Sequence, residues 1–156
     1  GRGPDGVTWN TEADYRQVGE ELGLALFDQL GLGLTASTWS YGMPCASLML
    51  AAALTPQLDG SHDANLAIVG GPSSGLGVLA VGNSQVVQPL PSPWASCALL
   101  TPPVGTAILV LSPAGAAVTS LSVPAIPGLA AYLQVVSLDA ALNLDASNGV
   151  VIENNY

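Results

Sequence analysis

The side chains best suited to bind a ligand lie in the stretch LDGSHDAN. Asp59, Asp63 and Asn65 offer hard oxygen ligands of the kind that Ca²⁺ prefers. Their spacing does not match an EF-hand loop, and Asp-Gly is also an ordinary hairpin turn. The two interpretations are therefore a calcium site and a turn without a metal, and no other cofactor is expected. Asp139, Asp145 and Asn148 form a second set with the same two interpretations.

The only histidine, His62, lies between Ser61 and Asp63. Three consecutive side chains cannot hold the relay geometry of a Ser-His-Asp triad. The chain has no lysine, and its acids show no pairing pattern for acid–base work. We therefore expect His62 to be a solvated loop residue and the protein not to be an enzyme.

Two aromatic residues, Trp39 and Tyr41, are two positions apart and would share one face of a strand. Such a pair can stack on the apolar face of a sugar, or it can belong to ordinary core and edge packing. Both interpretations stay open from the sequence.

The two cysteines, Cys45 and Cys97, are separated by 52 positions, without a CxxC motif or a histidine pair. This pattern argues against a zinc site. The alternatives are two buried thiols or a disulfide, and we favour the disulfide because the rest of the composition is typical of an extracellular protein.

Charge is scarce along the whole chain. Of 156 residues, 8% are charged, against roughly 25% in an average soluble domain. The only cations are Arg2 and Arg16, and the net charge is -9. This balance excludes partners that need a basic surface, such as nucleic acids or anionic membranes. No apolar run approaches the roughly 20 residues of a membrane-spanning helix, so no membrane span is expected.

From residue 40 onward, short apolar runs alternate with Pro- and Gly-rich breaks every eight to twelve residues. Regularly spaced short strands with turn signals predict one antiparallel β-sandwich, immunoglobulin-like or jelly-roll-like, and therefore an all-β fold. We place this domain at residues 39–156 and an N-terminal extension at 1–38. The extension is polar at first and then rich in leucine.

The leucines of the extension recur at every second position except Asp28. They are Leu22, Leu24, Leu26, Leu30, Leu32 and Leu34. A helix over 11–30 also fits part of this segment, but Gly19 and Gly23 would each cost up to about 1 kcal/mol in its interior. The alternation favours extended structure over about 22–38, with one face that must be buried.

Several short motifs recur in a recognisable order, and together they span about residues 39–152. They are YGMPC at 41–45, VGGP at 69–72, PLPSP at 89–93 before Cys97, SVPAIPGLAAYLQ at 122–134 and SNG at 147–149. In this order they resemble a domain found, often C-terminally, in secreted proteins of planctomycete-type bacteria. The resemblance implies a small extracellular β-sandwich with a Cys45–Cys97 disulfide, and it implies no catalytic activity. It departs from the usual pattern at the second cysteine, where ASC replaces GGC.

Two functional hypotheses follow. In the first, the protein is an extracellular structural subunit that assembles into a filament with copies of itself. The leucine segment of one copy would then complete the sheet or groove of the next copy. In the second, it is a secreted or cell-surface adhesion module that binds glycans, and residues 22–38 are the first strand of its own sandwich. The chain begins at Gly1 without a methionine, as expected for a processed secreted protein.

Overall fold

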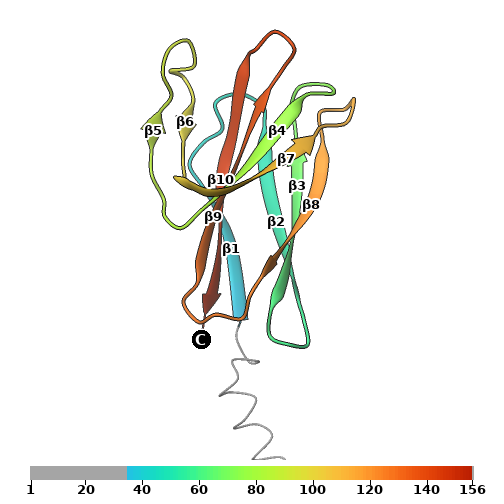
Figure 1. Cartoon of the computed structure of the whole chain (residues 1–156), viewed down its shortest axis with the longest axis vertical. Helices are drawn as coiled ribbons and strands as arrows, with labels where there is room; N and C mark the ends of the chain where they lie inside the picture. Colours follow the sequence, from blue (N-terminus) through green and yellow to red (C-terminus); the bar gives the residue numbers. More distant parts are fainter. Residues whose placement is uncertain (1–34, 156) are drawn as a thin grey trace, which may run out of the picture.

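A computed structural model describes residues 35–155 of the chain, and these residues form two antiparallel sheets packed face to face (Figure 1). The predicted all-β sandwich is therefore confirmed, and none of the described residues is helical. The strands are β1 (Thr35–Tyr41), β2 (Met49–Pro56), β3 (His62–Val69), β4 (Leu76–Gly82), β5 (Gln88–Pro89), β6 (Ala98–Leu99), β7 (Pro103–Val110), β8 (Ala117–Val123), β9 (Ala130–Leu138) and β10 (Leu144–Asn155).

The larger sheet has five strands in the order β1-β10-β9-β4-β7, and the smaller one has the order β2-β3-β8. Strands β5 and β6 pair in a short hairpin inside the loop 83–102. The first and last strands of the large sheet are β1 and β7, so each of them pairs along one side only.

The core lies between the two sheets, and β3 contributes to it by strict alternation, whereas β10 is buried over seven consecutive residues. In β3, every second side chain is buried, as in Leu66 and Ile68. From the large sheet, Leu133, Val135 and Ile152 meet them. Because side chains of a strand alternate between faces, the residues next to Leu133, Val135 and Ile152 along their strands lie on the outer face of the large sheet, away from the small sheet.

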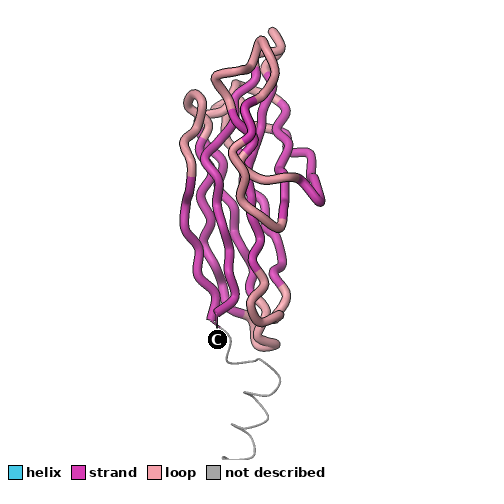
Figure 2. The backbone as a smooth tube through the Cα atoms, turned by 90° about the vertical axis from the view of Figure 1, so that its left-hand side faces the viewer, coloured by secondary structure: helices cyan, strands magenta, loops and turns pink. Residues whose placement is uncertain are grey.

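The molecule is elongated, and most of its strands run along the long axis (Figure 2), whereas β7 runs across it (Figure 1). Thr35, at the start of β1, pairs with Asn155 at the end of β10, so the described segment begins and ends at the same tip. Residues 35–38, which the sequence analysis assigned to the extension, therefore belong to the sheet. The leucines predicted for assembly, from Leu22 to Leu34, lie outside the described residues.

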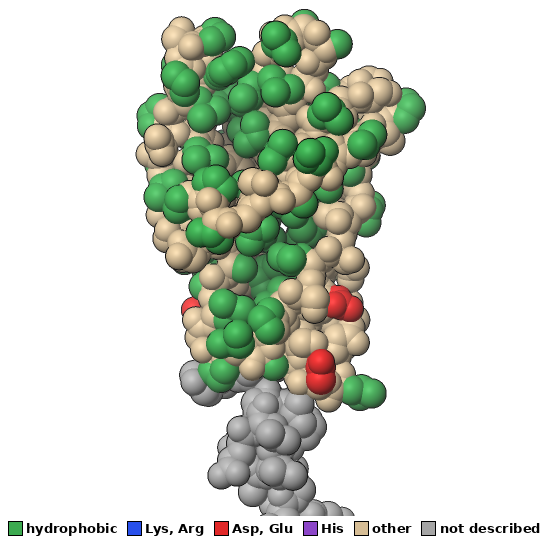
Figure 3. Space-filling view, viewed as in Figure 1, with side chains coloured by type: hydrophobic (Ala, Val, Ile, Leu, Met, Phe, Trp, Pro, Cys, Tyr) green, Lys and Arg blue, Asp and Glu red, His purple; other side chains and the backbone are tan. Residues whose placement is uncertain are grey.

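The described residues carry only acidic charges. These are Asp59, Asp63, Asp139, Asp145 and Glu153. On the face shown in Figure 3, the acidic side chains lie in the lower half, and the upper half, where β4 and β7 lie, shows hydrophobic and uncharged groups. The surface therefore offers little charge to keep copies of the protein apart.

Candidate functional site

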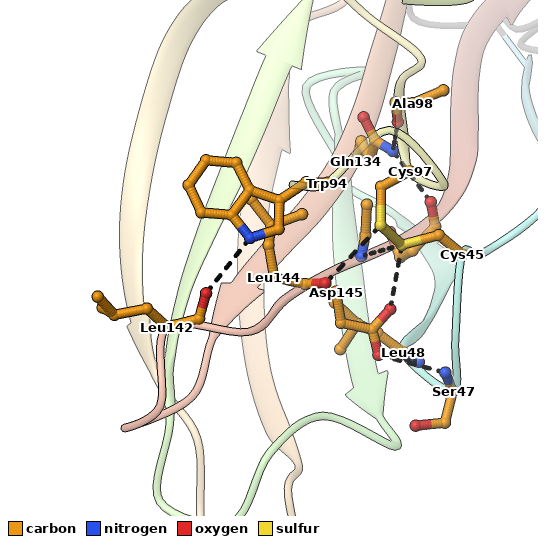
Figure 4. Close-up of a disulfide and its surroundings, with 12 residues drawn as sticks. Cys45, Ser47, Leu48, Trp94, Cys97, Ala98, Gln134, Leu142, Leu144 and Asp145 are labelled. Carbon is orange, nitrogen blue, oxygen red and sulfur yellow. Dashed lines mark hydrogen bonds between the residues drawn. A yellow bond between two sulfur atoms is a disulfide. The ribbon is translucent and has the colours of Figure 1, made fainter. Parts of the chain in front are cut away.

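Cys45 and Cys97 form a disulfide, as predicted, with their Cα atoms 4.9 Å apart. It ties the loop after β1 to the loop 83–102 (Figure 4). Two hydrogen bonds fix Cys45 to β10: its N–H donates to the carbonyl of Ala146 (3.0 Å), and its Sγ accepts the N–H of Ala146 (3.1 Å). The disulfide therefore fastens the long loop to the large sheet.

Gln134 of β9 also forms hydrogen bonds to the loop 83–102. Its side chain is fully buried, and its Oε1 accepts the N–H of Leu100 (2.9 Å). Its Nε2 donates to the carbonyls of Ala98 and Ser147, each at 3.0 Å. A buried amide needs such partners, and here they are backbone groups of the loop and of β10. Gln134 thus fixes the loop 83–102 on the outer face of the large sheet.

The Tyr41 ring lies directly over Gly149, where a Cβ atom would collide with it. Its hydroxyl donates to the carbonyl of Leu100 (3.2 Å), and its ring meets that of Tyr132 edge-on at 5.9 Å. Partial burial and, to a smaller extent, Tyr132 raise the pKa of Tyr41 to about 12. Tyr41 is therefore committed to packing, and of the predicted aromatic pair Trp39 is the more exposed, at 48%.

Asn148 joins the two sheets. A β-bulge between Ala146 and Gly149 interrupts the register of β10 with β9. The Asn148 side chain accepts the N–H of Leu50 (2.9 Å) and donates to the carbonyl of Leu50 (3.0 Å), so it pairs with β2 as a backbone strand would. Beside it, Ser147 Oγ accepts the N–H of Val135 (2.9 Å). Asn148 is therefore a structural residue.

The residues that carry the resemblance thus have structural roles. Tyr41, Cys45, Gln134 and the SNG tripeptide at 147–149 hold one loop and two sheets together.

Asp139 and Asp145 line an open pocket of about 250 Å³ beside the disulfide. Ser47 and Asn143 also line this pocket. Asp145 accepts the N–H groups of Ser47 (3.2 Å) and Leu48 (3.0 Å), as Figure 4 shows. Asp139 accepts the Asn143 side-chain amide and its backbone N–H, both at 2.8 Å, and these bonds lower the pKa of Asp139. Both carboxylates therefore already serve as acceptors for their own chain.

The first calcium hypothesis concerned Asp59, Asp63 and Asn65. Asp59 accepts the N–H (3.0 Å) and hydroxyl (2.6 Å) of Ser61, which lowers the pKa of Asp59. Asp63 accepts the side-chain amide of Gln57 (2.7 Å), and Asn65 donates to a threonine hydroxyl of β2 (3.2 Å). These bonds build the β2–β3 hairpin. Among residues 35–155, no group of three or more His, Cys, Asp or Glu side chains is placed to hold a metal ion.

The expectation for His62 is wrong. It is the first residue of β3 and is buried rather than solvated, because it faces the interior in the alternation of that strand. Its Nδ1 has no hydrogen-bond partner among the described residues. The sequence placed His62 in a loop because LDGSHD is polar, but the turn ends at Ser61, whose carbonyl accepts the Gln57 N–H (2.8 Å).

Several apolar side chains of the described domain are exposed, and we call one group of them the apolar edge surface. It lies on the outer face of the large sheet, next to its free edge, and consists of Leu76, Val78, Ile108, Val110 and Leu138. Ile108 and Val110 of β7 are 78% and 74% exposed.

This surface is not evident from the amino-acid sequence. The run AILVL is apolar at every position, which is the pattern of a strand buried on both faces. Only the strand order shows that β7 is an edge strand and that its outer face is uncovered.

The geometry defines a β-sandwich domain with one disulfide and a loop fixed across its larger sheet. No family model matches the chain, and no curated protein or solved structure is significantly similar to it. Within residues 35–155, no helix is long and apolar enough to cross a membrane.

Proposed function

We propose that this protein is an extracellular structural subunit that assembles with copies of itself into a filament. The observation that carries the proposal is the apolar edge surface, in a domain whose described residues hold five acids and no lysine or arginine. Soluble monomers rarely expose a contiguous apolar patch beside a free sheet edge, because such edges pair with other chains.

The disulfide supports an extracellular location. Disulfides persist in oxidising compartments and are rare in the cytosol of most organisms. The resemblance to secreted planctomycete-type domains points in the same direction.

The N-terminal segment supports a head-to-tail mode of assembly. The intervening residues of this segment are mostly small, as in a strand with one buried face, and its leucines are Leu22, Leu24, Leu26, Leu30, Leu32 and Leu34. When such a strand is added to the sheet of a neighbour, main-chain hydrogen bonds give affinity and side chains in pockets give register. Each copy both donates and accepts, so the contact does not close and a filament can grow.

Electron microscopy of the protein, isolated without denaturant, tests the proposal. We expect regular filaments for the natural sequence. The double substitution Leu26→Asp with Leu32→Asp should abolish them and leave a folded monomer, as judged by light scattering and circular dichroism. Discrete monomers of the natural sequence would contradict the proposal, and so would unfolding of the variant.

A glycan-binding adhesion module is the second candidate, and the exposure of Trp39 favours it. In this case, soluble oligosaccharides should change the tryptophan fluorescence of the natural protein. Trp39→Ala should remove that change without lowering the melting temperature by more than a few degrees.

A further inference from the structure

We infer that the apolar edge surface is the acceptor for residues 22–34 of a neighbouring copy, with the donor segment lying beside β7. The inference rests on the proposed self-assembly and adds the surface that receives the segment.

The outer edge of β7 is free to pair with an added strand. In the large sheet, β7 pairs with β4 and with no other strand of the described domain. Natural edge strands are usually protected by charged side chains, bulges or a covering segment. Residues 103–110 carry no charge at all, and their protective features, Pro103 and a register irregularity with β4 between Pro103 and Gly105, are confined to the start of the strand. An unprotected edge of this kind is a template for an added strand.

The apolar edge surface consists of rows of side chains that end at β7. Register places Val110 beside Leu76, and Leu76 beside Leu138, in one row across three strands. Ile108 and Val78 form the next row in the same way. The rows continue to β7 and stop there, so a strand added to β7 would extend both of them by one side chain each.

The donor segment, residues 22–34, matches the free edge of β7 in length and in the pattern of its side chains. At about 3.3 Å per residue, an extended segment of 13 residues spans about 43 Å, whereas the eight residues of β7 span about 26 Å. The donor is therefore long enough to cover the whole edge. In an extended strand its leucines would share one face with Asp28, which is the only charged residue of the segment.

The acceptor belongs to another copy because of the point at which the donor segment joins the sheet. Residue 34 is joined to Thr35 on β1, which is the opposite edge strand of the same sheet. The distance across the sheet from β1 to β7 is about 19 Å, because strands lie about 4.8 Å apart. Leu32 and Leu34 are at most about 10 Å from Thr35 along the chain and cannot reach β7 of their own copy. A donor at one edge and an acceptor at the other give a head-to-tail contact.

Photo-crosslinking of the full chain tests the inference. A photoreactive phenylalanine analogue replaces Ile108, and isotopically heavy and light copies are mixed before assembly and irradiation. We expect mixed heavy–light crosslinks from position 108 to peptides within 22–34 after pepsin digestion. Crosslinks to β7 of a second copy, crosslinks elsewhere, or crosslinks confined to one copy would each overturn the inference.

A matched pair of variants supplies the second readout. Ile108→Asp places a charge in the acceptor and should raise the protein concentration needed for filament formation at least about tenfold, since burying an unpaired charge is costly. Val118→Asp changes a residue of β8 that is 81% exposed on the other sheet, and it should have no such effect. Both side chains are exposed, so both variants should fold.

These outcomes separate the two proposals. Filaments that form equally well with Ile108→Asp would overturn the acceptor assignment and leave self-assembly standing. A natural protein that stays monomeric and gives no intermolecular crosslink would overturn both.

Discussion

At the scale of single residues, Gly149 shows how a backbone position depends on an aromatic ring. The Tyr41 ring occupies the space that a Cβ atom would need, and its hydroxyl is held by Leu100. We expect Gly149→Ala to lower the free energy of unfolding by about 1–3 kcal/mol, the usual cost of overpacking. Urea denaturation measures this.

Gly105→Ala is the matched control, because no atom lies within 4 Å of the place that its added methyl carbon would occupy. It should change the free energy of unfolding by less than about 1 kcal/mol. Equal effects of the two substitutions would mean that the ring does not restrict position 149.

Tyr41 also predicts a response to alkaline pH. Burial, with a smaller contribution from Tyr132, raises its pKa from 10.0 to about 12 in the folded protein. A group with a raised folded pKa favours folding fully below its unfolded pKa, and that contribution is lost as the pH rises from about 10 towards 12. Tyrosinate absorbance, compared between the natural protein and Tyr41→Phe, should show one tyrosine that titrates late. A difference titration centred near the ordinary value would contradict the assignment.

At the scale of elements, the β10 bulge determines how the two sheets are joined. Asn148→Ala removes both hydrogen bonds to Leu50 and leaves a buried N–H and carbonyl without partners. Each orphaned group costs about 1–3 kcal/mol, so the free energy of unfolding should fall by about 2 kcal/mol or more.

Asn65→Ala is the control for this prediction, since it removes one exposed hydrogen bond to Thr55. Its effect on urea denaturation should be within about 0.5 kcal/mol, as for most surface substitutions. An Asn148→Ala variant as stable as this control would show that the side chain does not join the sheets.

The strands differ in how far the sequence alone predicts them. In β3, the apolar run between turn residues predicted a strand, but the face that is buried, which includes His62, is known only from the structure. In β7, a uniformly apolar run specified a strand but not its position in the sheet. Alternation reports one covered face, whereas edge position depends on pairing with distant strands.

At the scale of the whole molecule, the net charge of -9 predicts how assembly responds to salt. Copies repel one another through their acids, and the proposed contact contains no ion pair that salt would weaken. Added sodium chloride screens this repulsion, so assembly should begin at a lower protein concentration. Light scattering across a salt series measures the effect, and dissolution of assemblies by salt would contradict an apolar contact.

The candidate site shows the same division between sequence and structure. The sequence predicted the disulfide, since only two cysteines are present and the composition is typical of an extracellular protein. It did not predict the hydrogen bonds of the Gln134 and Asn148 side chains to Leu100 and Leu50, because these partners are 34 and 98 positions away in the chain. Side-chain to backbone bonds of this range exist only after the sheets have packed.

The sequence by itself determined the all-β class, the spacing of the strands and the scarcity of charge, because these depend on local alternation, turn residues and composition. The tertiary structure shows that Tyr41, Asp59, Asp63 and Asn65 form hydrogen bonds within the domain. It also decided that β1 and β7 lie at opposite edges of one sheet and that the apolar edge surface is exposed. These features depend on strand order, which is set by contacts between residues far apart in the chain.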